Sequence, residues 1–178
     1  MADSKSDSII NKHFATNSLE NPLWLYACQV YSQPGVETAL LTLQDEYGAD
    51  INLILQALWL ANEGINWTPA CIPEDYQPWI TEQVIPIRNM RRRLKTQWVE
   101  QRGLGFEDFR QQVKKLELQA EQYALVMLFV QSEAKRNGFK KNGAKKSELD
   151  ILAEENLKQL GENMDILPEY FELLMAAL

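Results

Sequence analysis

The sequence predicts an all-helical protein, built as a five-helix bundle followed by a C-terminal pair of short helices. Good helix formers are frequent, and apolar residues recur at spacings of three and four. Only 7 prolines and 8 glycines interrupt the 178 residues, and we find no convincing strand pattern and no internal repeat. The composition, 46% hydrophobic and 24% charged, is that of a globular chain with a core and not of a disordered one.

We divide the chain into four segments by composition and charge. Residues 1–20 have little periodicity and are expected to form a flexible N-terminal arm, followed by a helical bundle domain at 21–137. Residues 138–146 are a basic, glycine-containing linker, and 147–178 are an acidic helical appendage. Net charge follows a block pattern: −9 over 1–87, +9 over 88–146 and −7 over 147–178. These blocks either neutralise one another within the fold, which we favour, or direct the middle block to an anionic partner.

Local capping signals define the first three helices. Asn21 is expected to cap a helix that has Pro22 at its first position and runs to about residue 31. Pro34 and Gly35 break the chain and begin a second helix, again with proline near its first position, which ends at Gly48.

The third helix, at 51–63, is expected to be central. Asp50 is a natural N-cap, and Gly64 closes the segment. Residues 51–61 are apolar on nearly every side of the helix, as is typical of a buried helix.

A fourth helix is predicted over about 74–101, with Pro86 kinking or splitting it. After the proline the helix has two faces. The apolar face, an arc of about 80°, carries Ile87, Met90, Leu94 and Trp98. The neighbouring arc of about 100° is basic and carries Arg88, Arg91, Arg92, Lys95 and Arg102.

The fifth helix, of about 30 residues from Phe106, carries a heptad-like apolar stripe. The stripe over 106–134 is expected to pack lengthwise on another helix, and a homo-oligomer is one way to cover it. After Asn137-Gly138 and the linker, Ser147 is expected to cap a short helix. A last helix begins at Asp165 or at Leu167-Pro168.

Three short motifs stand out in the chain. The first is Tyr-x-x-Pro-Gly-Val, from Tyr31 to Val36. The second is Leu-Gln-Asp-x-x-Gly-x-Asp-x-Asn-Leu, from Leu43 to Leu53. The third is the basic Pro-x-Arg segment from Pro86 to Arg88. Together these motifs resemble an uncharacterised proteobacterial family of small helical proteins. The resemblance covers about residues 20–135 and implies a helical fold, with no activity, cofactor or catalytic residue to transfer.

A first candidate site is a polar pocket between the second and third helices. Its candidate residues are Gln44, Asp45, Asp50, Asn52, Gln56 and Glu63. Several lie on one stripe of an otherwise apolar helix, and polar groups there need hydrogen-bond partners. The favoured interpretation is structural, with Asp50 as a cap and the amides joining the helix pair. The alternative is a ligand pocket or an oxygen-ligand cation site.

A second candidate site is the arginine-rich helix face, comprising Arg88, Arg91, Arg92, Lys95 and Trp98. Guanidinium groups on one face bind phosphates or carboxylates, and an adjacent tryptophan stacks on a base or a guanidinium. The competing interpretation, which we favour, is a solvated face paired with acids of the N-terminal block.

Common catalytic machinery is absent from the sequence. The single histidine, His13, lies in the expected arm, and there is no glycine-rich phosphate loop and no Cys-x-x-Cys. We therefore expect no cofactor and no metal. No signal segment or membrane span is evident, so we expect a cytoplasmic protein with Cys28 and Cys71 reduced.

Three functions remain open from the sequence. The first is a non-enzymatic interaction or regulatory protein of the bacterial cytoplasm, with an unknown protein partner. The second is a binder of an anionic ligand, nucleic acid or a phosphorylated metabolite, through the arginine-rich face. The third is an enzyme with the polar pocket between the second and third helices.

Overall fold

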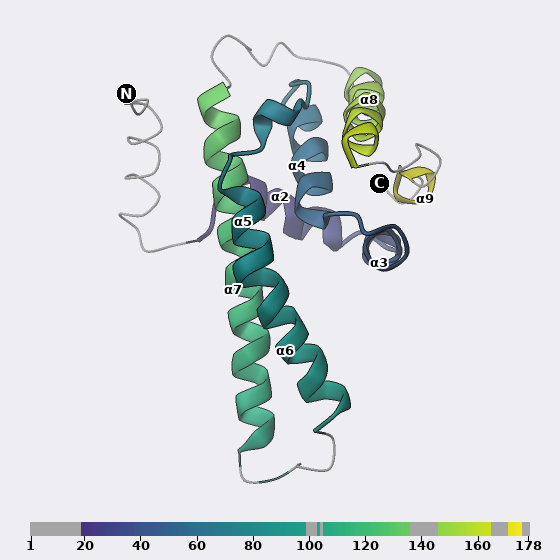
Figure 1. The fold of residues 1–178 in the computed structure, drawn as a ribbon. Coiled ribbons are helices and arrows are strands. Elements are labelled where there is room, and N and C mark those ends of the chain that lie inside the picture. The colour runs from purple at the N-terminus through teal and green to yellow at the C-terminus, as the bar shows by residue number, and fades with distance from the viewer. Residues whose placement is uncertain (1–18, 99–102, 104, 136–145, 165–170, 176–178) are drawn as a thin grey trace, which may run out of the picture.

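The structure is a computed structural model that describes residues 19–98, 103, 105–135, 146–164 and 171–175. Every regular element in these residues is a helix, and no strand occurs among them, so the predicted all-helical class is confirmed (Figure 1). Residues 1–18 of the predicted arm, which include His13, lie outside the described residues, as do most of the basic linker and the predicted starts of the last helix. None of the described helices is long and apolar enough to cross a membrane.

The first helices begin where the capping residues predict. Helix α2 spans Pro22–Tyr31, and the Asn21 side chain accepts a hydrogen bond from the Trp24 amide at 3.0 Å. Helix α3 spans Val36–Tyr47 and ends at Gly48, which has the left-handed φ of 68°. Pro34 lies two residues before Val36, near the first helical position as predicted. Gly35 occupies the N-cap with φ 87°, a conformation that favours glycine.

Helix α4, Ile51–Asn62, is the centre of the molecule. All residues from Leu53 to Ala61 are buried, including the polar Gln56. Helices α2, α7 and α8 pack against it, so its apolar circumference is covered on several sides. The buried helix predicted at this place is confirmed.

Pro86 modifies the next helical segment without ending it. A short 3-10 turn, Pro69–Cys71, leads to α5 (Tyr76–Trp79), a π-helical turn (Ile80–Val84) and α6 (Ile85–Thr96). At this turn the Ile85 amide donates to the Ile80 carbonyl, a wider spacing than in an α-helix. Proline has no N–H to donate, and the π-turn accommodates it at the first turn of α6.

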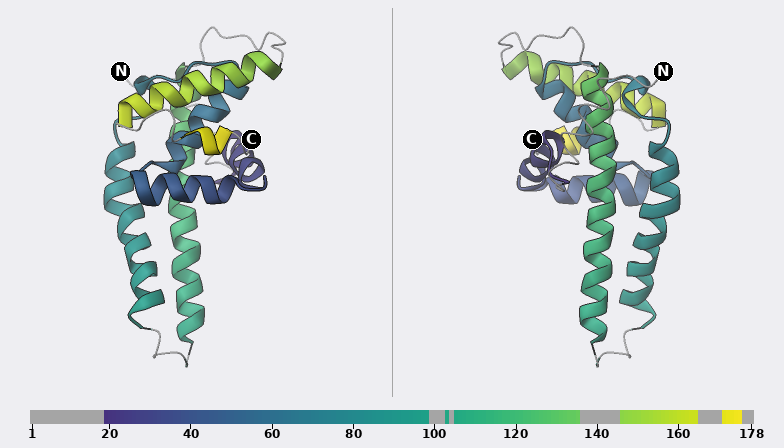
Figure 2. Two further views of the ribbon diagram at one scale, coloured as in Figure 1. Left: turned by 90° about the vertical axis from the view of Figure 1, so that its right-hand side faces the viewer. Right: turned by 90° about the vertical axis from the view of Figure 1, so that its left-hand side faces the viewer.

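Helix α7, Phe106–Lys135, runs beside α6 as an antiparallel hairpin that extends away from the other helices (Figures 1 and 2). The C-terminal half of α7, from Ala124 to Val130, is almost entirely buried in the core. Its N-terminal half has only Val113, Glu117 and Ala120 buried. We call α6 and the N-terminal half of α7 the hairpin. We call the other part, made of α2 to α5, the C-terminal half of α7, α8 and α9, the head.

The C-terminal segment packs onto the head. Helix α8, Lys146–Met164, lies across α4, and the short α9, Glu172–Met175, packs against α3 (Figure 2). Leu157, Leu160, Phe171 and Leu174 are buried in the common core. With 19 residues, α8 is longer than the short helix expected. The detailed five-helix-plus-pair topology and the four-segment division remain predictions.

Buried amides hold this arrangement together. The Asn156 side chain on α8 donates to the Ala57 and Ile65 carbonyls at 3.0 Å each and accepts from the Trp67 amide at 2.8 Å. A buried amide that makes all three bonds orients α8 on α4, because any other register would leave polar groups unpaired.

Candidate functional site

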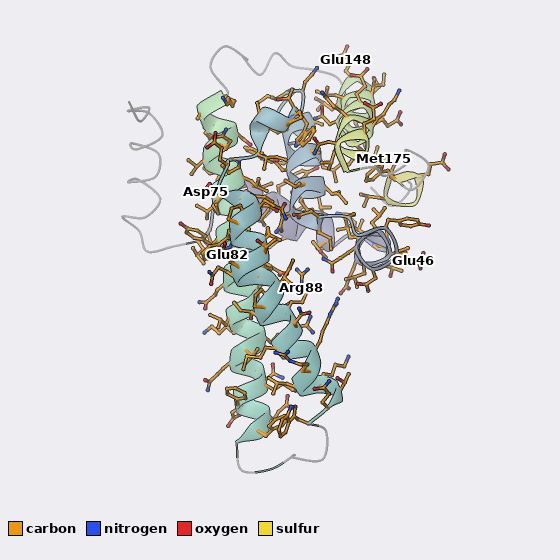
Figure 3. All side chains as sticks on the ribbon, in the orientation of Figure 1. Glu46, Asp75, Glu82, Arg88, Glu148 and Met175 are labelled. Carbon is orange, nitrogen blue, oxygen red and sulfur yellow. The ribbon has the colours of Figure 1, made fainter. Side chains whose placement is uncertain are left out.

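A groove of about 1350 Å³ lies between the head and the hairpin. Helices α2, α3, α6 and α7 and the N-terminal part of α4 contribute most of its lining, with smaller contributions from α5, the π-helical turn and the C-terminal end of α8. Figure 3 shows Arg88 on the side of α6 that is turned toward α3. The groove unites residues from both sites predicted from the sequence. From the polar set it contains Gln44, Asp45, Asp50 and Asn52, and from the arginine set Arg88, Arg91 and Arg92.

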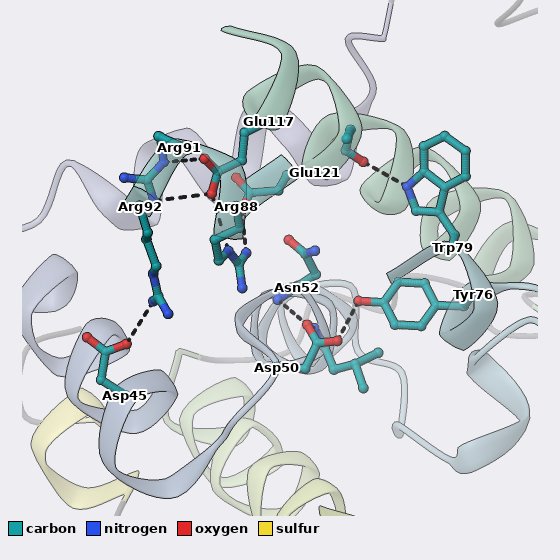
Figure 4. A network of polar contacts seen from close by, with 12 residues as sticks. Asp45, Asp50, Asn52, Tyr76, Trp79, Arg88, Arg91, Arg92, Glu117 and Glu121 are labelled. Atoms are coloured by element: carbon teal, nitrogen blue, oxygen red, sulfur yellow. Dashed lines mark hydrogen bonds and ion pairs between the residues drawn. The ribbon is translucent and has the colours of Figure 1, made fainter. Parts of the chain in front are cut away.

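Asp50 is a half-buried acid of the groove that caps α4. Its carboxylate accepts from the Asn52 and Leu53 amides at 2.9 and 3.4 Å, which caps α4, and from the Tyr76 hydroxyl at 2.9 Å (Figure 4). Burial raises the pKa of Asp50, while these hydrogen bonds and the nearby Arg88 oppose the rise. Burial and the neighbouring Asp50 raise the pKa of Tyr76 well above its usual value, so its hydroxyl remains a donor.

A network of ion pairs joins α6 to α7. Arg88 donates to Glu117 at 3.2 Å and to Glu121 at 2.5 Å, and Arg91 also binds Glu117 (Figure 4). Glu117 is buried, and burial raises the pKa of Glu121, against the influence of Arg88. Arg88 and Arg91 therefore donate several of their hydrogen bonds to Glu117 and Glu121 within the protein.

The expected pairing of the arginines with acids of the N-terminal block occurs once in the described residues. Arg92 lies 3.4 Å from Asp45, and both side chains are more than half exposed. The main partners, Glu117 and Glu121, were missed by the sequence reasoning. Their signal is an i, i+4 pair of carboxylates on α7, the spacing that matches two arginines one turn apart on an antiparallel neighbour.

Lys95 and Trp98 complete the predicted arginine face but do not line the groove. Both lie near the far end of α6 and are exposed, Trp98 by 51%. Trp98 therefore lies apart from the paired guanidinium groups that line the groove.

Gln56 lies in the core, outside the groove lining. It is fully buried, and its amide nitrogen lies within hydrogen-bond distance of the Cys71 carbonyl (2.9 Å), the Leu128 carbonyl (3.3 Å) and the Ser132 hydroxyl (2.9 Å). Its amide oxygen accepts from the Trp67 indole at 3.2 Å. Glu63 is half-buried at the C-terminal end of α4, outside the groove lining. Gln44 and Asn52 are half-buried and within the lining.

The groove combines balanced charge with exposed apolar side chains. Its acids are Glu37, Asp45, Asp50, Glu117 and Glu121, and its bases are Arg88, Arg91, Arg92, Lys114 and Lys115. Acids and bases are equal in number, so the groove has no strong preference for an anion. Its large apolar side chains include Tyr31, Leu41, Ile85 and Leu118, which come from four helices and are each 36% exposed or more.

Little in the groove is suited to covalent or metal chemistry. Cys28 lines the groove and is exposed. Partial desolvation of its thiol and, second to that, the negative charge of the nearby Glu20 raise the pKa of the thiol. A raised pKa disfavours the nucleophilic thiolate. Burial, with Glu121 and Glu37, raises the pKa of Tyr31 to about 12. Across the described residues, no group of three or more His, Cys, Asp or Glu side chains is placed to hold a metal ion.

Comparison with known proteins gives one family. A family model described as "Protein of unknown function (DUF2390)" matches residues 22–128, which span α2 to most of α7. No curated protein and no solved structure gives a significant match. The matched region includes every element that lines the groove except the C-terminal end of α8.

Proposed function

The chain belongs to the family "Protein of unknown function (DUF2390)", and we propose that it is a non-enzymatic interaction protein that binds a polypeptide segment of a partner in its groove. The observation that carries this proposal is the convergence of Leu41, Ile85 and Leu118 in one groove. They come from three helices, and each is 39% exposed or more. Apolar side chains gathered in a concave surface are typical of a binding site.

The size and charge of the groove support a polypeptide over a small ligand. Small-molecule pockets have volumes of about 300–1000 Å³, and this groove, at about 1350 Å³, is larger. An amphipathic helix laid in such a groove places apolar side chains on the floor and polar ones at the rim. The exposed Glu37, Lys114 and Lys115 at the rim supply both signs of charge for orienting it.

The location, the source organism, the family motifs and the functional unit that we expect from the sequence are also part of this proposal. We take the protein to act in the cytoplasm of a proteobacterium and the motifs at Tyr31–Val36 and Leu43–Leu53 to be signatures of its family. Both motifs contribute to the groove, through Tyr31 and through Gln44, Asp45 and Asp50 to Leu53. We also keep residues 21–137 as the functional unit, with 147–178 as its appendage.

Two leucines of α7 allow a sharp test. Leu118 lines the groove and is 46% exposed, whereas Leu116, two residues away, is 51% exposed and does not line it. A photo-crosslinking amino acid at position 118 should form a covalent adduct with a distinct partner protein in cells. The same amino acid at 116 should not capture that partner.

Substitutions in the groove provide the second half of the test. Leu41→Asp together with Ile85→Asp should abolish the adduct formed from position 118, while circular dichroism remains that of the parent because both side chains are already exposed. The proposal fails when position 118 captures nothing that position 116 does not also capture.

A second candidate function is binding of an anionic ligand. Arg92, Lys95, Lys114 and Lys115 are exposed on the hairpin, with Arg92, Lys114 and Lys115 also lining the groove. This candidate predicts salt-sensitive binding of single-stranded DNA or heparin at low ionic strength. Binding should be lost in a variant in which four basic residues are replaced by Gln: Arg88, Arg91, Arg92 and Lys95. Absence of polyanion binding by the parent at low salt would exclude it.

A further inference from the structure

The hairpin has a second exposed side, opposite the groove. On α7, Phe109 and Leu116 lie within about 20° of one another, and Leu116 is about 160° from the groove residue Leu118. On α6, Met90 lies about 160° from the groove residue Arg88. Met90, Phe109 and Leu116 are 37%, 43% and 51% exposed. We call these three residues the back stripe.

The back stripe is the uncovered remainder of the heptad-like pattern. Towards the head, Tyr123 continues it and is covered by Trp79, with ring centroids 4.6 Å apart. Beyond that point α7 is buried in the core of its own chain. A homo-oligomer formed through the stripe over 106–134 therefore has only the part of α7 before Tyr123 available as a contact surface.

The hairpin has little apolar burial of its own in the described residues. Not one residue of α6 is buried, and Ile87 and Leu94 are only half-buried between the helices. Ion pairs from Arg88 and Arg91 to Glu117 and Glu121 join the two helices. A two-helix element gains stability when its second side is also covered, because most helical stability in proteins comes from packing of an apolar face.

The back stripe is free of charge. On α7, Gln112 and Gln119 lie within about 60° of Leu116, and the acidic Asp108 lies at the edge of this side, about 80° away. On α6, the basic Arg93 lies at the edge, about 60° from Met90, so the two edges carry one acid and one base. In a two-fold contact each surface meets its own copy, so a charged surface would face like charges. An uncharged apolar stripe avoids that repulsion and is self-compatible.

We infer that the back stripe is the contact surface for a second copy of this chain, so that two hairpins form a four-helix bundle around Met90, Phe109 and Leu116. Such bundles cover each hairpin on its second side through coiled-coil-like packing. The two grooves lie on the outer sides of this dimer and remain open. The inference does not rest on the function proposed for the groove.

Sedimentation equilibrium of the full-length protein over a concentration series tests the inference. The parent should sediment as a dimer, and Leu116→Glu should weaken dimerisation by about tenfold or more, because a buried charge would be left unpaired. The matched control, Leu118→Glu on the opposite side of the same helix, should remain as dimeric as the parent. Circular dichroism should be unchanged in both variants, since both leucines are exposed.

Cysteine crosslinking in a Cys28→Ser background supplies the second measurement. Leu116→Cys should form a disulfide between two copies under mild oxidation, and Leu118→Cys should not. A parent that remains monomeric at the highest concentrations overturns the inference, as does a dimer that Leu116→Glu leaves intact. Failure of this test leaves crosslinking of a distinct partner from position 118 unaffected, so the two proposals fail separately.

Discussion

Individual side chains in this protein divide into those that join distant segments and those that face the groove. Asn52 and Gln56 lie on the same stripe of α4, yet Gln56 is enclosed by the Trp67 indole, the Cys71 carbonyl and Ser132, whereas Asn52 lies in the groove lining. The sequence indicated that these amides join helices. Their actual partners could not be derived, because the partners of Gln56 are 11 to 76 residues away along the chain.

The carboxyl group of Asp50 should make the stability of the protein depend on pH. Burial raises the pKa of its carboxyl in the folded state, so the folded chain holds the proton more tightly than the unfolded chain. The stability that comes from the protonated Asp50 carboxyl is complete below the pKa of this group in the unfolded chain, about 3.9. It is lost as the pH rises through the pKa of the same group in the folded chain. Asn at this position still caps α4 through its Oδ1, while its Nδ2 takes the place of the oxygen that accepts from Tyr76 and instead donates to the Tyr76 hydroxyl. Asn does not ionise.

Urea unfolding at a series of pH values measures this effect. The free energy of unfolding of Asp50→Asn, relative to the parent, should rise with pH above about 4 by up to about 1.4 kcal/mol per unit and then level off. Tyr76→Phe removes a hydrogen bond that lowers the pKa of Asp50 and should extend the pH dependence of the chain to higher pH. A stability difference between Asp50→Asn and the parent that is constant across the range would contradict the prediction.

At the scale of elements, α6 depends on its ion pairs with α7. The arginine face is predictable from the spacing of basic residues, but its partners are not the N-terminal acids that the charge blocks suggested. Net charge over a block does not specify which acid lies opposite which base, since that depends on the register of the antiparallel hairpin. Glu117, buried beside Arg88 and Arg91, satisfies two cations that would otherwise compete for an external anion.

Glu117→Gln should loosen the hairpin. The substitution leaves Arg88 and Arg91 without their shared carboxylate and should destabilise the protein by about 2 kcal/mol. Hydrogen exchange of the α6 amides should accelerate by about tenfold or more, while that of the α4 amides changes less. The matched control is Glu107→Gln, an exposed partner of Arg110 on the same helix, which should leave exchange in α6 nearly unchanged. Equal exchange rates in the two variants would contradict a specific role for Glu117.

At the scale of the whole molecule, α8 and α9 complete a core that the family match does not include. The matched residues end at 128, whereas Leu157, Leu160, Phe171 and Leu174 are buried against the head. Asn156 also satisfies the Trp67 amide and the Ala57 and Ile65 carbonyls, groups that lie within the matched region. The acidic tail, expected to dock on its own bundle or on a partner, here packs on its own bundle.

Truncation after residue 145 tests the contribution of the tail. Loss of the four buried apolar side chains and of Asn156 should lower the melting temperature by about 10 °C or more. Ile151→Ala, which removes an exposed side chain of α8, should melt within a few degrees of the parent. Differential scanning calorimetry makes the comparison, and a truncated chain that melts with the parent would show that the head is complete without α8 and α9.

The sequence by itself determined the helical class, the starts of α2 and α4 and the burial of α4. These features depend on interactions within a few residues: a capping side chain bonds to an amide two or three positions away, and an apolar circumference excludes a helix from water. The back stripe also has a local origin, since the period of α7 alone places Phe109 and Leu116 together.

Only the tertiary structure decided which polar residues meet. The convergence of the two predicted sites in one groove, the pairing of Arg88 and Arg91 with Glu117, and the bond from Asn156 to Ala57 each join segments that are far apart in the chain. Such contacts form when the packing of apolar faces sets the register between helices. Residue type and local spacing specify that a polar group needs a partner, whereas the register of packed helices selects the partner.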